Sequence, residues 1–273
     1  MRASIRAIFL LLFFATAATA CDLRVAVTIA PQVEFVNAVG GSDVTVTVAV
    51  PPGSNPETFE MDWPTIKALS RAQAYFAIGD VPFEAANLDR IAKFNRDIRV
   101  YRPSYGNYSG EGYDHHVWMS PIAMVSQVNL IYTGLAKLCP DHAKQYRSNA
   151  DRYIARLHQL DQDIIQTFRN KTQRTFIIDH PVLDIFAKRY GLTQLAIEKE
   201  GKEPTSAHLR DLLNQTQRLG IRTFFAQKAF NEITARHFAQ SMHVTQLVWV
   251  DPFSPRYIEN MQKMAGQLAQ SMR

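Results

Sequence analysis

The chain has 273 residues, of which 20% are charged, and its formal net charge is +5. A chain of this length can bury a substantial hydrophobic core and is expected to hold two domains. The positive excess is small and forms no cationic block, so the composition gives no reason to expect nucleic acid as a partner.

Residues 1–20 have the order of a secretory signal peptide. Arg2 and Arg6 precede an apolar stretch over residues 7–18, and a small-residue cleavage site, Ala18-Thr19-Ala20, comes directly before Cys21. The apolar stretch is too short to span a bilayer, which favours a cleaved signal over a membrane helix. We therefore expect an exported protein whose mature part begins at Cys21.

The two cysteines leave the form of the exported protein open. Cys21 is a position where a lipid could anchor the protein to a membrane, but Ala18 stands where lipoprotein signals usually have Leu, so periplasmic release is equally compatible. Cys139 lies in a Leu-Cys-Pro segment at a predicted helix end. One disulfide would suit an oxidising compartment. Because two cysteines carry no framework pattern, we expect Cys139 to be structural and free.

The first half of the mature chain alternates predicted strands with predicted helices. Apolar and β-branched runs at 23–29, 44–50, 74–78 and 98–101 are typical of buried parallel strands. Helical patterns lie between them at 31–39, 64–71 and 83–94. Asp62 and Pro64 are typical of a helix start. Residues 21–140 are predicted to form an N-terminal α/β lobe.

A long helical segment follows, and then the alternation repeats. Residues 141–168 carry an apolar stripe at three- and four-residue spacing, and residues 141–170 are predicted to connect two lobes rigidly. The C-terminal lobe, residues 171–273, has predicted strands at 175–178, 192–197, 222–226 and 244–250 and predicted helices at 182–190, 206–219, 232–242 and 255–272. The predicted fold class is therefore α/β, with two parallel-sheet lobes joined by one long helix.

Four residues with metal-binding side chains stand near the ends of predicted strands or in loops that follow them: Glu57, His116, His180 and Asp251. Ligands of open α/β sheets bind beyond the carboxyl ends of the strands, so two facing lobes would bring these residues into one cleft. Taken singly, each has an ordinary role as a packing, capping or turn residue. Together, two imidazoles and two carboxylates would form a closed shell for a divalent transition metal.

The segments around these residues resemble those of the zinc/manganese solute-binding proteins of ABC importers. The resemblance lies in residues 51–60, 114–121, 179–192 and 251–261, in the family's order along the mature chain. It implies two α/β lobes joined by one long helix, a metal ion held between them as cargo, and delivery to a membrane permease. We accordingly expect a monomeric binding protein that is not an enzyme.

The sequence departs from this family at three positions. Family members usually have His at the position of Glu57, Pro at that of His115, and often Glu at that of Gln227. His115 and Gln227 are therefore candidates for contacting the ligands, and His115 is also an alternative ligand if its loop shifts. Two histidines and two carboxylates suit manganese better than three histidines do, but zinc outbinds manganese at most such sites. Zinc is the predicted cargo, with manganese or ferrous iron as alternatives.

Two other functions are compatible with the same residues. A secreted zinc hydrolase would keep one metal position open for water, as would follow if Glu57 stood away from the metal, although the chain has no His-Glu-x-x-His motif. A carrier of the same architecture could instead bind haem or a metal chelate in a wider pocket. The remaining histidines are expected at the surface or at helix ends: His142, His158, His208, His237 and His243.

Overall fold

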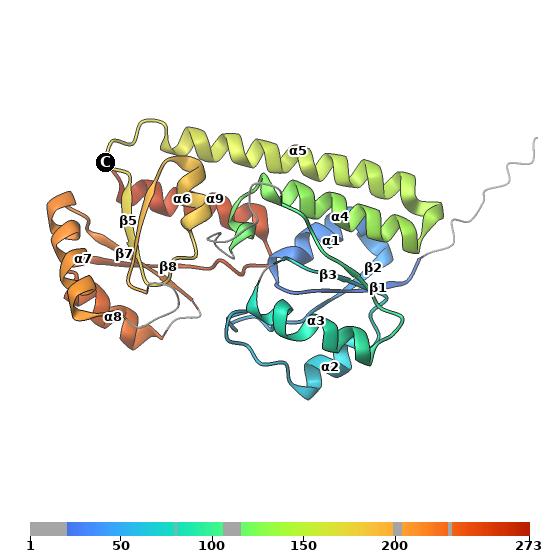
Figure 1. The fold of residues 1–273 in the computed structure, drawn as a ribbon. Coiled ribbons are helices and arrows are strands. Elements are labelled where there is room, and N and C mark those ends of the chain that lie inside the picture. The colour runs from blue at the N-terminus through green and yellow to red at the C-terminus, as the bar shows by residue number, and fades with distance from the viewer. Residues whose placement is uncertain (1–20, 80, 106–115, 199–203, 229–230) are drawn as a thin grey trace, which may run out of the picture.

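The computed structural model describes residues 21–79, 81–105, 116–198, 204–228 and 231–273 (Figure 1). Two four-stranded sheets form the centres of two lobes. The first sheet has the order β2-β1-β3-β4, with β1 (Leu23–Val27), β2 (Val44–Val48), β3 (Ala74–Phe76) and β4 (Arg99–Tyr101). The second has the order β6-β5-β7-β8, with β5 (Thr175–Ile178), β6 (Thr193–Ala196), β7 (Thr223–Gln227) and β8 (Gln246–Val250). Every strand pairing is parallel, which confirms the predicted fold class.

Helices cover both faces of the first sheet (Figure 1). One face carries α1 (Pro31–Gly40) and α4 (Ala123–Leu138), and the other carries α2 (Trp63–Leu69) and α3 (Pro82–Phe94). Because side chains alternate along a strand, Val25 and Val27 of β1 pack into the core on one face and Ala26 packs into a separate core on the other. The predicted alternation did not include α4. Asp62 stands at the start of α2, as predicted, and also caps it, because its Oδ1 accepts a hydrogen bond from the Thr65 backbone N–H.

The second sheet is covered in the same way. The helices α6 (Asp184–Tyr190) and α9 (Tyr257–Ser271) lie on one side, and α7 (Ser206–Leu219) and α8 (Glu232–Ser241) lie on the other. Phe176 and Ile178 of β5 belong to the core shared with α6 and α9, whereas Ile177 belongs to the core beneath α7 and α8.

The helix α5 (Ala143–Phe168) runs along both lobes (Figure 1). Its 26 residues span about 39 Å at the α-helical rise. The stripe predicted from the sequence is its buried face, and residues from both lobes pack against it in one continuous hydrophobic core. The predicted start at residue 141 falls instead in a short 3-10 helix, η4 (Pro140–His142).

Direct contacts between the lobes are also tight. The indole Nε1 of Trp118 donates a hydrogen bond to the Pro252 carbonyl at 3.0 Å, and the Tyr257 hydroxyl donates to the Trp118 carbonyl at 2.7 Å. Trp118 belongs to η3 (Val117–Met119) and is 1% exposed. This buried contact holds the segment after β8 against the segment that carries His116.

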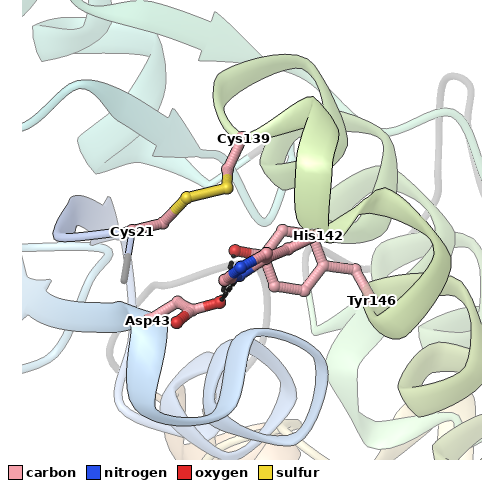
Figure 2. Close-up of a disulfide and its surroundings, with 5 residues drawn as sticks. All are labelled: Cys21, Asp43, Cys139, His142 and Tyr146. Carbon is pink, nitrogen blue, oxygen red and sulfur yellow. Dashed lines mark hydrogen bonds and ion pairs between the residues drawn. A yellow bond between two sulfur atoms is a disulfide. The ribbon is translucent and has the colours of Figure 1, made fainter. Parts of the chain in front are cut away.

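Cys21 and Cys139 form a disulfide (Figure 2), so the prediction that Cys139 is free was wrong. The bond joins the segment before β1 to the residue that follows α4, and the two cysteines are 118 positions apart in the sequence. Sequence spacing could not reveal that the fold brings these two ends together. Among the described residues, no helix combines the length and apolar character needed to cross a membrane.

Candidate metal site

Glu57, His116 and His180 converge in space, although they are far apart in the sequence. Glu57 Oε1 lies 3.1 Å from His116 Nε2 and 3.3 Å from His180 Nε2, and the two Nε2 atoms are 3.3 Å apart. The side chains of the two histidines are 5% and 9% exposed and that of Glu57 is 22% exposed. Three of the four predicted ligands therefore form one nearly buried cluster.

The spacing of these atoms suits a small metal ion. Zinc binds nitrogen and oxygen ligands at about 2.0–2.2 Å, so two ligands of a tetrahedral ion lie about 3.3 Å apart. The three separations in the cluster are 3.1, 3.3 and 3.3 Å. These three side chains could therefore form one face of a coordination tetrahedron.

Each side chain is positioned by its own local structure. Glu57 lies in the loop between β2 and α2, where its backbone N–H donates to the Asn55 side chain. His116 directly precedes η3, and its ring packs edge-on against Trp118 at a centroid distance of 5.1 Å. His180 follows β5, so two of the three clustered side chains come from the first lobe and one from the second.

Glu198 orients His180, a role that the sequence prediction missed. Its Oε2 lies 2.8 Å from His180 Nδ1, leaving Nε2 to face Glu57 and His116. A carboxylate on the outer nitrogen of a ligand histidine fixes the ring and raises its basicity. Glu198 follows β6 by two residues, so the strand-end rule that selected His180 could also have found it.

The buried carboxylate of Asp179 holds the same segment through two hydrogen bonds. One carboxylate oxygen accepts a hydrogen bond from the His180 backbone N–H at 2.7 Å and the other accepts from the Gln227 backbone N–H at 3.0 Å. Burial of Asp179 raises its pKa to about 6 despite these two bonds. Gln227, predicted to contact the ligands, is thus linked to His180 through the Asp179 carboxylate.

The charges in the cluster favour a protonated histidine beside ionised carboxylates. Burial raises the pKa of Glu57, but the hydrogen bonds and charges of His116 and His180 outweigh it and leave the pKa well below its ordinary value. Burial lowers the pKa of His180, but Glu198 and Glu57 together raise it to about 10. In the metal-free protein a proton on His180 supplies the positive charge that a metal ion would otherwise provide.

Asp251 lies outside the cluster of three described donors. Its Oδ1 accepts from the Phe253 backbone N–H, and its Oδ2 lies 3.3 Å from Lys228 Nζ. The next residue, Pro252, accepts the hydrogen bond of Trp118. The segment of Asp251 is therefore adjacent to that of His116, while its carboxylate is paired with a lysine.

Other predicted positions are placed as follows. His115 and residues 1–20, the predicted signal peptide, lie outside the described residues. His142 lies at a helix end, as expected, because it directly precedes α5, but its side chain is only 12% exposed and pairs with Asp43. His208 Nε2 is 2.9 Å from the Ala196 carbonyl, close to the end of β6.

Comparison with known sequences identifies relatives over most of the chain. The family described as "ZnuA: Zinc-uptake complex component A periplasmic" matches residues 25–271. "Zinc-binding protein AdcA" of Streptococcus pyogenes serotype M6 is 24% identical over 255 residues, covering 83% of this chain and 50% of the relative. "Zinc-binding lipoprotein AdcA" of Streptococcus pneumoniae strain R6 is 24% identical over 253 residues, covering 85% and 50%. The chain spans about half the length of these curated relatives.

Similar structures and a further relative agree with this match. "High-affinity zinc uptake system protein ZnuA" of Bacillus subtilis strain 168 is 30% identical over 131 residues, covering 47% of this chain and 40% of the relative. The structure "Crystal structure of ZnuA" superposes with a TM-score of 0.83 at 29% identity, covering 91% of this chain and 98% of the other. The structure "138-173 ZnuA deletion mutant plus zinc bound" gives the same TM-score and identity, with 91% and 97% coverage.

Proposed function

Because the chain belongs to the ZnuA family of zinc-uptake components, we propose that it captures one zinc ion between its lobes and delivers it to the permease of an ABC importer. The observation that carries this proposal is the mutual 3.1–3.3 Å spacing of the Glu57, His116 and His180 donor atoms. The family consists of transport components rather than enzymes, which removes the support for a hydrolase.

We assign the roles in the site as follows. Glu57 supplies one oxygen and the two histidines supply their Nε2 atoms, while Glu198 holds His180 in the required orientation. Asp251 is the proposed fourth ligand, because the Trp118–Pro252 hydrogen bond keeps its segment beside His116. To bind the metal, the Asp251 carboxylate must release Lys228 and contact the ion instead. Two carboxylates would then balance the charge of a divalent cation.

Zinc is the cargo that the donor set and the family name favour together. Two imidazole nitrogens suit zinc, and zinc binds such sites more tightly than manganese or ferrous iron does. The carboxylates make the site harder than one with three histidines, so manganese and ferrous iron are the competing ions. Donor atoms in direct contact with one another suit a bare ion rather than haem or a chelate.

For its location, we propose an exported periplasmic protein that is not anchored through Cys21. The sulfur of Cys21 is bonded to Cys139, and a disulfide sulfur offers no thiol for a lipid. Intact-mass measurement of the exported protein distinguishes the two forms. A mass that includes an acyl-glyceryl group on Cys21 would refute this location.

Calorimetric titration, with elemental analysis of protein purified without added metal, tests the function. We expect one saturable zinc ion per chain, and a higher melting temperature with zinc because the ion binds the folded site and not the unfolded chain. The His116→Ala variant should lose this binding, whereas His158→Ala, on an exposed part of α5, should keep it. Equal zinc binding by both variants would refute the site.

A further inference from the structure

A second group of ligand-type side chains lies away from the proposed zinc site. One potential ligand atom from each of Cys21, Cys139 and His142 falls within 4.8 Å of the others. Figure 2 shows the two cysteines joined by their disulfide beside His142, Asp43 and Tyr146. Cys21 lies before the amino end of β1, whereas the proposed zinc ligands lie beyond carboxyl ends of strands. The two groups are therefore at opposite edges of the first lobe.

His142 is held as a ligand histidine is held in many zinc sites. Its Nδ1 lies 2.5 Å from Asp43 Oδ2, and the Tyr146 hydroxyl donates to the same oxygen at 2.8 Å. The side chains of His142 and Asp43 are only 12% and 10% exposed. A carboxylate on one ring nitrogen fixes the ring and its tautomer, so Nε2 is the nitrogen available to a metal.

We propose that reduction of the Cys21–Cys139 disulfide creates a second zinc site, formed by the two thiolates and His142. Two electrons and two protons from a dithiol reductant, which itself becomes a disulfide, convert the bond into two thiols. Zinc then displaces both thiol protons, and the two thiolates balance its charge. Two cysteines and one histidine are an established ligand set for zinc. Water completes the shell.

The backbone positions allow this exchange. In a tetrahedral site with Zn–S distances of about 2.3 Å, the two sulfur atoms lie about 3.8 Å apart. The Cα atoms of Cys21 and Cys139 are 6.5 Å apart, near the upper end of the range of about 4.4–6.8 Å found for disulfides. Rotation of the two side chains can therefore separate the sulfurs without moving β1, which follows Cys21, or α4, which precedes Cys139. The disulfide and the bound zinc cannot be present together, because both use the same two sulfur atoms.

The test uses the full chain with a His116→Ala substitution, so that the first site contributes no binding. Zinc is titrated into the oxidised protein and into protein reduced with a phosphine, which does not compete strongly for the metal. We expect no binding to the oxidised form and one zinc per chain in the reduced form. Cobalt in place of zinc should give the near-ultraviolet charge-transfer absorption of thiolate ligands.

Variants identify the ligands. Cys139→Ser should show no zinc binding with or without the reductant, and His142→Ala should abolish tight binding in the reduced form although both thiols remain. Asp43→Asn should weaken binding by roughly 10–100-fold, as expected for a carboxylate that orients a ligand histidine. His237→Ala, on α8 in the other lobe, is the matched control and should have no effect.

Three results would overturn the proposal. The reduced protein could bind no metal, or His142→Ala could bind it as tightly as its parent, in which case the thiols act without the histidine. Loss of the far-ultraviolet circular dichroism signal on reduction would also contradict it, because the site requires the folded arrangement of β1 and α4.

Discussion

The Nε2 atoms of His116 and His180 lie 3.3 Å apart, although 64 positions separate them and each belongs to a different lobe. Glu57 Oε1 contacts both nitrogens. A cation bound at this point would take the place of the proton on His180 and would link the facing edges of the two lobes. Binding of cargo and the stability of the two-lobed structure are therefore expected to be coupled.

Removing the Glu198 carboxylate, which contacts His180, should weaken zinc binding without removing a ligand. Glu198→Ala leaves the Nδ1 atom of His180 without its orienting partner, and we expect a loss of roughly 10–100-fold in zinc affinity. Glu198→Gln should lose less, because an amide oxygen can still accept the Nδ1 hydrogen. Competition titration with a chelator measures both. Identical affinity in Glu198→Ala and the parent would show that the contact has no role in binding.

The charge at position 57 should tune metal selectivity. Carboxylate oxygen favours harder cations than imidazole does, so Glu57→His should raise the preference for zinc over manganese while preserving binding. Glu57→Ala should weaken binding of both metals. Parallel titrations with the two metals test this. If Glu57→Ala left both affinities unchanged, Glu57 would have to be removed from the site.

Zinc affinity should rise with pH well beyond the ordinary histidine range. Burial lowers the pKa of His180, but Glu198 and Glu57 raise it to about 10 from an ordinary value of 6.5. Zinc must displace this proton, so affinity should increase up to about pH 10, and binding at pH 7 should release a proton. Calorimetry in buffers of different ionisation enthalpy counts that proton. An affinity that levels off above pH 7 would contradict this prediction.

The same pKa predicts the opposite trend for the stability of the metal-free protein. A group whose pKa is higher in the folded state binds more protons there than in the unfolded chain, so stability falls with rising pH between the two values. The contribution of His180 should be fully present below about pH 6.5 and lost as the pH passes through 10. Urea unfolding of metal-free protein across this range measures it, and His180→Ala should flatten the dependence. A slope that persists in that variant would assign it to other groups.

The lobes should move little when zinc binds. Hinge closure needs a few residues that absorb large backbone changes, but α5 runs uninterrupted along both lobes and Trp118 is buried in their contact. Solution scattering should give nearly the same radius of gyration with and without zinc. A large compaction on binding would contradict this view of the connection.

The parts of the fold that repeat along the chain were predictable. Apolar runs of strand length alternating with helical patterns indicated two parallel sheets, and the stripe through Tyr153 and Leu160 indicated the buried face of α5. The strand-end rule also selected His180, which the structure joins to Glu57 and His116. The strand-end rule could bring these residues together because strand direction decides at which edge of a sheet a side chain emerges.

Features that depend on contacts between distant segments were not predictable in this way. The disulfide joins two segments whose proximity only the packing of α4 beside the first sheet creates. The Asp43–His142 pair lies beside the disulfide. Its members are 99 positions apart in the sequence, so their contact could not be predicted either. Glu198 stands two residues beyond a strand, where the strand-end rule makes it a candidate, but the glutamates and lysines from residue 198 to residue 203 do not distinguish an orienting carboxylate from a surface charge. The pairing of Asp251 with Lys228 likewise follows from the adjacency of β7 and β8.

The proposed site holds one zinc ion between Glu57, His116 and His180, with Asp251 as the fourth ligand. An anomalous difference map from crystals grown with zinc, measured at the zinc absorption edge, locates the ion. We expect one strong peak about 2.0–2.2 Å from both Nε2 atoms and from an oxygen of each carboxylate. A map with no peak between the lobes, or with its peak on other residues, would refute this site.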